Sequence, residues 1–223
     1  MKTSYRLTIV IAVQHAVQNL PGILAALDPA SHADVEFIIC ATVSEPVEIG
    51  QADLHDNLML LKDAENSLIP VLWKNGIMRA TADKVALTTA HCIPSRHWVD
   101  RLLEADMTIS PALGGIIAND PNSNASSWAI YLLRYISFSP PLAAGETAEI
   151  AADNAMYRRA DILQHEDLLE DGFWEPSFHH RFRQAGLPLL LDPELEVTHK
   201  NRYSTRQFFH QRLAHGKAFG MER

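Results

Sequence analysis

Apolar runs typical of buried strands alternate with a helical pattern in the N-terminal part of the chain. Leu7–Val13 is a continuous run rich in β-branched residues and predicts a strand buried on both faces. A helical pattern follows, with Asn19 as its expected N-cap and Pro21 in its first turn, and it ends at Leu27. Val35–Cys40 predicts a second buried strand. This order indicates parallel strands joined by right-handed crossovers.

The middle of the chain continues the alternation of strands and helices. The expected elements are a strand at Leu58–Leu61, a helix at Trp73–Ala80, a strand at Lys84–Thr88, a loop ending at Pro94, and a helix at Ser95–Glu104 with Ser95 as its N-cap.

The pattern changes in the second half, where strands and helices no longer alternate regularly. The expected elements are a strand at Ala112–Ala118, an apolar and aromatic helix at Ser126–Ser137, a strand-rich segment from Glu149 to Tyr157, a helix at Ser177–Ala185 ended by Gly186, and a strand at Leu187–Leu191. We expect the helix at Ser126–Ser137 to pack on the body rather than to contact a ligand.

Composition places the chain among ordinary globular proteins. Of its 223 residues 47% are hydrophobic and 21% are charged, which suits one α/β domain. Its apolar stretches fall short of the ~20 residues that cross a bilayer. Gln14 and His15 interrupt the first of them, which argues against a cleaved signal peptide. Cys40 and Cys92 form no CxxC pair and are expected to be reduced, so the expected location is the cytoplasm.

Charge is unevenly distributed along the chain. The formal net charge of -8 argues against nucleic-acid binding, which requires a basic surface. The segment Lys200–Arg223 nevertheless holds six Lys or Arg residues against Glu222 alone, so it carries +5 and the remainder carries -13. A basic tail on an acidic body suggests an anionic partner. The two candidates are a diphosphate and the inner face of a membrane, at which the protein would be peripheral.

Several residue groups, in their order along the chain, resemble inverting family 2 glycosyltransferases of the GT-A type. The groups are Asn75-Gly76-Ile77 with Ala80, Asp83 before the fourth strand, Asn154-Ala-Met-Tyr-Arg-Arg159, Arg181 with Gly186, Pro193, and Val197-Thr198-His199. The resemblance implies a three-layer α/β/α fold with a mostly parallel central sheet. It also implies a nucleotide-binding half at 1–110, an acceptor half at 111–199 and a basic C-terminal helix at 200–223.

The activity implied by this resemblance is transfer of a sugar from a nucleotide-diphosphate sugar to a small-molecule or lipid-linked acceptor. Three motifs depart from the family pattern. Ala41 and Thr42 stand where an acid usually reads the nucleobase, and Thr89-Ala90-His91-Cys92-Ile93-Pro94 stands in place of the metal-binding Asp-x-Asp. Only the Gln of the Gln-x-x-Arg-Trp sequence of processive synthases remains, at Gln211. The chain therefore resembles a divergent, non-processive branch with His-Cys-x-Pro after the fourth strand.

Glu175 is the candidate general base. It aligns with the family's base in front of Arg181, and inverting transfer requires a group that removes the acceptor's hydroxyl proton. Trp174 and Pro176 could desolvate its carboxylate and raise its pKa. The alternative is that Glu175 only caps the helix that begins near Ser177.

The same resemblance implies a set of residues that contact the nucleotide sugar. They are Val13, Thr42, Lys74, Asn75, Thr89, His91 and Arg212. His91 and His199 could together hold a divalent metal on the diphosphate, and two imidazoles favour manganese or zinc over magnesium. Alternatively, Lys74 and the Arg and Lys residues of the tail could neutralise the leaving group without a metal.

Two functions of different classes remain open. One is the transferase, and the other is a degenerate GT-A module that binds a nucleotide sugar or a protein partner without turnover. A nucleotidyltransferase is disfavoured because Gln14–Leu20 contains no glycine for a phosphate loop. For either function we expect Thr89–Pro94 and Glu175 to open on one cleft at the carboxyl ends of the strands.

Overall fold

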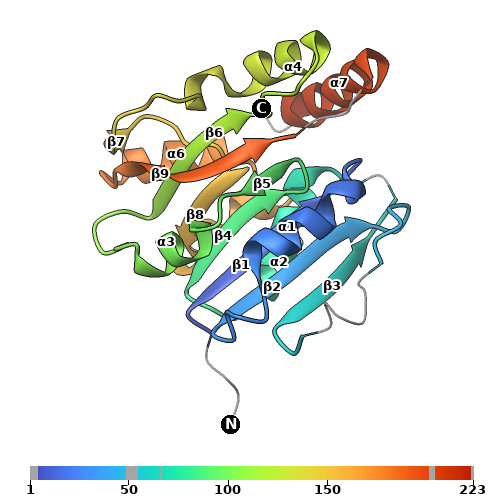
Figure 1. The fold of residues 1–223 in the computed structure, drawn as a ribbon. Helices are drawn as coiled ribbons and strands as arrows, with labels where there is room; N and C mark the ends of the chain where they lie inside the picture. Colours follow the sequence, from blue (N-terminus) through green and yellow to red (C-terminus); the bar gives the residue numbers. More distant parts are fainter. Residues whose placement is uncertain (1–4, 49–54, 66, 201–203, 222–223) are drawn as a thin grey trace.

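The computed structural model describes residues 5–48, 55–65, 67–200 and 204–221. Their strands form one sheet in the order β3-β2-β1-β4-β8-β6-β9-β5, with β7 paired to β9 (Figure 1). The strands are β1 (Leu7–Val13), β2 (Val35–Thr42), β3 (Leu58–Asp63), β4 (Lys84–Thr89), β5 (Cys92–Pro94), β6 (Ala112–Asn119), β7 (Gly145–Thr147), β8 (Asn154–Arg158) and β9 (Leu189–His199).

The parallel part of the sheet comes from the alternating N-terminal region, as expected. Strand β1 pairs in parallel with β2 and β4, and β2 pairs in parallel with β3. Strand β8 then runs antiparallel to both β4 and β6, and β6 runs parallel to β9. The predicted α/β class with a mostly parallel central sheet is confirmed. Strand β8 lies between β4 and β6, and its first residue, Asn154, pairs with Thr88. The residues just before β8 therefore lie near the carboxyl end of β4, in the middle of the sheet.

Helices cover both faces of the sheet. The helices are α1 (Leu20–Leu27), α2 (Ile69–Arg79), α3 (Trp98–Glu104), α4 (Ala125–Tyr135), α5 (Arg159–Leu163), α6 (Glu175–Gln184) and α7 (Thr205–Met221), with short 3-10 turns such as η3 (Ile136–Phe138). Leu7, Ile9 and Ile11 pack in one core with α1, α3 and α4, while Val10 and Ala12 pack in a second core with α2, α5 and α6. The alternation along β1 thus separates two apolar cores, which explains its continuous apolar sequence.

Strand β9 is longer than its sequence pattern indicated. The prediction of Leu187–Leu191 was too short, because Asp192-Pro193-Glu194 interrupts the apolar run without ending the strand. The pairing register with β6 shifts between Gly115 and Ile116. A Cβ at Gly115 would lie 1.8 Å from the carbonyl oxygen of Leu195, so only glycine fits this irregularity. The extension carries His199 to the end of β6 opposite Asn119.

Several helix starts differ from the predicted positions. The Asn19 side chain does not cap α1 but donates to the carbonyl oxygens of Ala90 (2.9 Å) and Lys200 (3.2 Å). Helix α3 begins at Trp98 rather than at Ser95, because β5 runs to Pro94 and the backbone N–H of Ser95 still donates to the carbonyl oxygen of Glu196 in β9 (3.0 Å). Helices α2 and α6 begin a few residues earlier than expected, at Ile69 and at Glu175.

Two sequence expectations concern membranes and the C-terminal tail. No helix in the described ranges is both long enough and apolar enough to cross a bilayer. Of the charged tail residues, Arg202, Glu222 and Arg223 lie outside the described residues, whereas Arg206, Arg212 and Lys217 belong to α7.

Candidate active site

A cavity of about 300 Å³ lies where α2, α4, α6, α7 and the segment before β8 converge. Its apolar wall comes from Ile69, Pro70 and Trp73 of α2 and from Leu133 and Phe138. The indole N–H of Trp73 donates to the carbonyl oxygen of Thr88 (3.0 Å), which fixes α2 against the end of β4. The polar groups of the cavity are contributed by Arg134, Tyr135, Asp153, Glu175 and Arg212.

Glu175 is the first residue of α6 and lies in this cavity between Trp174 and Pro176. Burial raises the pKa of its carboxyl group from 4.5 to about 7, and the negative charge of Asp153 adds to the shift. Its own backbone N–H and the cation of Arg134 act in the opposite direction. A carboxyl group with a pKa near neutrality can exchange a proton at physiological pH, as a general base requires. The expected desolvation of Glu175 is therefore present.

Asp153 is a second carboxylate in the cavity, and sequence reasoning did not identify it. Its side chain is 8% exposed, and its Oδ1 accepts hydrogen bonds from Tyr135 Oη (2.8 Å) and Thr89 Oγ1 (3.3 Å). Nη2 of Arg134 lies 3.5 Å from the same oxygen. All three of these groups approach Oδ1. Asp153 thereby connects α4, the end of β4 and the cavity.

Two arginines supply positive charge at the cavity. The Arg134 side chain is 15% exposed, and its Cζ lies 4.8 Å from the centroid of the Tyr135 ring. Arg212 reaches the cavity from α7. A partly buried guanidinium keeps its charge and presents a planar set of donors to phosphate oxygens. The helix containing Arg134 was expected to pack on the body rather than to contact a ligand; it packs on the sheet, and its residues Leu133, Arg134 and Tyr135 also line the cavity.

A buried network below the cavity attaches α6 to the sheet. His179 lies one turn after Glu175, and its imidazole nitrogens lie 2.9 Å from Glu149 Oε2 and 3.0 Å from Tyr157 Oη. The pKa of Tyr157 is raised well above 10 by burial and by the nearby charge of Glu175. These contacts join α6 to β8 and hold Glu175 close to Asp153.

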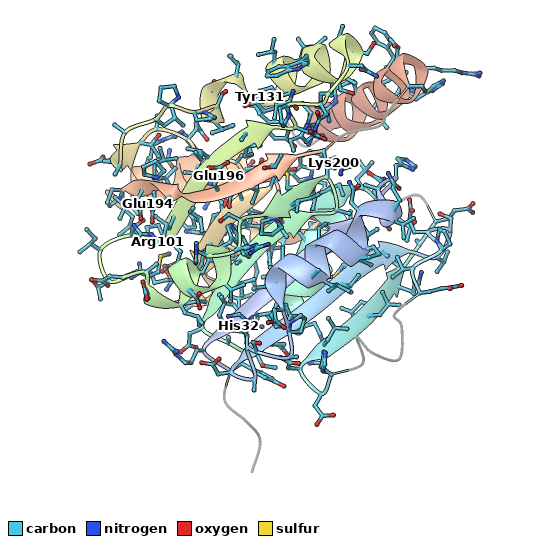
Figure 2. All side chains as sticks on the ribbon, in the orientation of Figure 1. His32, Arg101, Tyr131, Glu194, Glu196 and Lys200 are labelled. Atoms are coloured by element: carbon cyan, nitrogen blue, oxygen red, sulfur yellow. The ribbon has the colours of Figure 1, made fainter. Side chains whose placement is uncertain are left out.

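The two candidate metal ligands lie near each other, but neither lines the cavity. The ring centroids of His91 and His199 are 6.2 Å apart, and both residues are buried. Nε2 of His91 lies 3.0 Å from the carbonyl oxygen of Gln14, and burial lowers the pKa of this imidazole to about 3. The His199 ring packs against Tyr131 and Tyr135. Tyr131, on the inner face of α4, donates to the carbonyl oxygen of Ile117 (2.6 Å; Figure 2).

These surroundings do not suit a metal that must also contact a diphosphate. In the described part of the chain, no group of three or more His, Cys, Asp or Glu side chains is placed to hold a metal ion. Burial also lowers the pKa of His199 to about 2, and its ring nitrogens have no hydrogen-bond partner among the described residues. The imidazole of His199 is therefore neutral and packs in an aromatic cluster with Tyr131 and Tyr135.

The remaining candidate donor-binding residues lie at the carboxyl edge of the parallel strands. Val13 ends β1, and Thr42 ends β2 with its Oγ1 3.0 Å from Ser44 Oγ. Thr42 also pairs with Asp63, the last residue of β3. A carboxylate thus stands beside Thr42, the position at which the sequence resemblance implies an acid that this chain lacks. Only the pairing of β2 with β3 reveals it.

Lys74 and Asn75 are held by neighbouring groups in α2. Lys74 Nζ donates to the carbonyl oxygen of Glu170 (2.8 Å), and the Asn75 amide donates to Asp63. Asp63 also accepts from Ser67 Oγ (2.9 Å). Of the residues expected from the sequence, Glu175 and Arg212 meet in the cavity and Thr89 contacts it through Asp153. Val13, Thr42, Lys74, Asn75, His91 and His199 do not line it.

The sheet order and the helices on both faces define an α/β fold that is also found among solved structures. Among solved structures, the chain is similar to the mannosyltransferase PcManGT from Pyrobaculum calidifontis, whose structure is a complex with GDP-Man and Mn²⁺. The TM-score is 0.62 at 14% sequence identity, and the match covers 94% of this chain. It covers 62% of that protein's chain. No protein-family profile and no curated protein sequence matches the chain.

Proposed function

We propose that the protein transfers a sugar from a nucleotide-diphosphate sugar to an acceptor hydroxyl, with inversion and without processive extension. The observation that carries this proposal is the Glu175 carboxyl group, whose pKa is raised to about 7 in a cavity that also holds Arg134 and Arg212. A base and cations in one cavity are the two requirements of glycosyl transfer. The fold shared with a GDP-Man-bound mannosyltransferase supports the same class of donor.

In the proposed reaction, the Glu175 carboxylate accepts the proton of the acceptor hydroxyl. The acceptor oxygen forms a bond to the anomeric carbon while the bond from that carbon to the diphosphate oxygen breaks. The leaving nucleoside diphosphate keeps the electron pair, and Arg134 and Arg212 stabilise its developing charge. Val13, Thr42 and Asp63, at the ends of adjacent strands, would bind the nucleoside.

The second candidate is a module that binds a nucleotide sugar or a protein partner without turnover. It is favoured by the fourth-strand segment, where Thr89 and His91 replace the metal-binding carboxylates and point into buried contacts. This module would keep donor binding through the strand ends and the arginines. It would not use Glu175 for proton transfer.

Turnover of a nucleotide-sugar panel separates the two candidates. The donors are incubated with acceptors or with water alone, with and without Mn²⁺, and release of nucleoside diphosphate is measured. Donor binding is followed by thermal shift, since a ligand of the native state raises apparent stability. The transferase is supported if the Glu175→Gln variant releases less nucleoside diphosphate than wild type while it binds the donor equally well. Binding of a donor with no release across the panel supports the module.

A further inference from the structure

The outer surface of α4, η3 and α7 is exposed and apolar. The large apolar side chains exposed there are Trp128, Leu132, Leu133, Ile136, Phe209 and Leu213, and we call this set the apolar face. Elsewhere in the described residues, the exposed large apolar side chains are Val43, Met78 and Ile109, which are far apart in sequence. Helices α4 and α7 both line the cavity and lie at the same end of the molecule (Figure 1). The apolar face therefore lies on helices that also line the cavity, and Leu133 belongs to both.

Helix α4 is apolar on both of its sides. Its inner side packs on the sheet through Ile130, Tyr131 and Tyr135, which are almost fully buried. Its outer side presents Trp128 and Leu132, which are 40% and 44% exposed. A helix that is apolar all round is normally covered on every side, and a contiguous exposed patch marks a surface for a partner.

Positive charge flanks the apolar face, and acidic residues are missing from the segments that build it. Residues 121–145 and 200–221 contain no Asp or Glu, although the chain has 27 acidic residues in all. On α7, the exposed residues Arg206, Phe209, Leu213 and Lys217 follow one another at intervals of three and four, so they lie along one side of the helix. Two cations thus bracket two exposed apolar side chains on the same helix surface.

We propose that the apolar face docks the protein on an anionic lipid bilayer. Interfacial helices bind bilayers by inserting aromatic and aliphatic side chains at the level of the headgroups while lysine and arginine contact anionic lipids. Trp128 suits this interface because its ring is amphipathic. Leu133 is 74% exposed and also lines the cavity, so the cavity opens within the docking surface. A lipid-linked acceptor would reach Glu175 from the bilayer, and this last step alone rests on the proposed transfer reaction.

A second copy of the chain is a less suitable cover for the apolar face. A two-fold interface would place the same patch against itself. Arg206 and Lys217 of each copy would then approach the basic helix of the other, and like charges across an interface oppose association. Anionic lipid complements both the apolar and the basic side chains.

Vesicle flotation tests the proposal directly. The full chain is mixed with vesicles of phosphatidylcholine alone or with 30% phosphatidylglycerol added, about 30% being a typical anionic fraction for charge-dependent binding. Binding is measured at low and high salt, and the oligomeric state is measured by light scattering. The apolar variant is Leu132→Ser with Phe209→Ser, and the charge variant is Arg206→Gln with Lys217→Gln. The matched controls are Met78→Ser with Ile109→Ser, and Arg79→Gln with Arg96→Gln, at exposed positions away from the apolar face.

The expected result is binding to anionic vesicles that high salt weakens. The apolar variant should bind vesicles at least roughly tenfold more weakly than wild type, because it removes two inserting side chains. The charge variant should lose about 10- to 30-fold on anionic vesicles only, and the controls should bind like wild type. Failure of the wild type to float, or equal losses in the controls, would overturn the proposal. A dimer that the apolar variant dissociates, without vesicle binding, would also overturn it in favour of self-association.

The test is independent of the transfer reaction. Hydrolysis of a soluble nucleotide sugar reports on the cavity, whereas flotation reports on the apolar face. Vesicle binding without any turnover would remove the proposed function and keep the docking surface. Turnover of soluble substrates without vesicle binding would keep the proposed function and remove the docking surface.

Discussion

Glu175→Gln should change how stability depends on pH, because the cavity favours the protonated carboxyl group. The pKa of Glu175 is raised from 4.5 to about 7 in the folded state. The protonated group therefore contributes stability fully below its unfolded pKa, and this contribution is lost as pH rises through about 7. A displacement of this size corresponds to about 2 to 3 kcal/mol between pH 5 and pH 8, at 1.36 kcal/mol for each pKa unit.

The measurement is urea unfolding of wild type and Glu175→Gln at pH 5 and pH 8. Glutamine keeps the size of the side chain and cannot ionise, so the variant should be more stable than wild type at pH 8 and close to it at pH 5. The difference between the two pH values should be about 2 to 3 kcal/mol. Glu166→Gln, at an exposed position outside the cavity, is the control and should show no such difference.

The same variant should lose about 10²–10⁴-fold in turnover while donor binding changes little, since only proton acceptance is removed. Higher stability at pH 8 together with lower turnover would indicate a catalytic role for Glu175, because an ionisable group kept in a desolvated site for catalysis lowers the stability of the protein. Parallel pH profiles of the two proteins would refute the pKa argument. Equal turnover of the two proteins would remove Glu175 from the mechanism.

Three further outcomes are expected. Arg134→Gln should weaken binding of nucleoside diphosphate by about tenfold, because a cation of the cavity is lost. Calorimetry measures this affinity, and an unchanged value would exclude Arg134 from the donor site. Gly115→Ala should lower the free energy of unfolding by at least about 2 kcal/mol because its Cβ meets a backbone carbonyl, whereas Gly22→Ala, with open space around it, should not. His199→Phe should leave any manganese dependence of turnover unchanged, because no group of three or more ligating side chains surrounds His199 in the described part of the chain. Lost manganese dependence would restore His199 as a ligand.

The sequence alone was sufficient for the parallel strands and for two residues that line the cavity, Glu175 and Arg212. Strands β1, β2 and β4 are buried on both faces along most of their length, so their largely apolar sequences mark them without tertiary information. Glu175 was identified through the resemblance of the segment before Arg181 to family 2 glycosyltransferases, and the apolar neighbours that desolvate it are adjacent in sequence. Local patterns determine such features because the interactions that decide them span only a few residues.

The tertiary structure alone decided which groups share the cavity and how far some elements extend. Asp153 directly precedes the Asn154 motif, and that adjacency was the available signal, yet its role comes from Tyr135 and Thr89 on distant segments. Arg134 sits in an apolar helix whose period indicates packing, and no local pattern states that it faces Asp153. Strand β9 resumes after Pro193-Glu194 because Glu196–His199 pair with β6 and Val197–His199 pair with β5. These features depend on contacts between segments remote in sequence, which residue spacing along the chain does not encode.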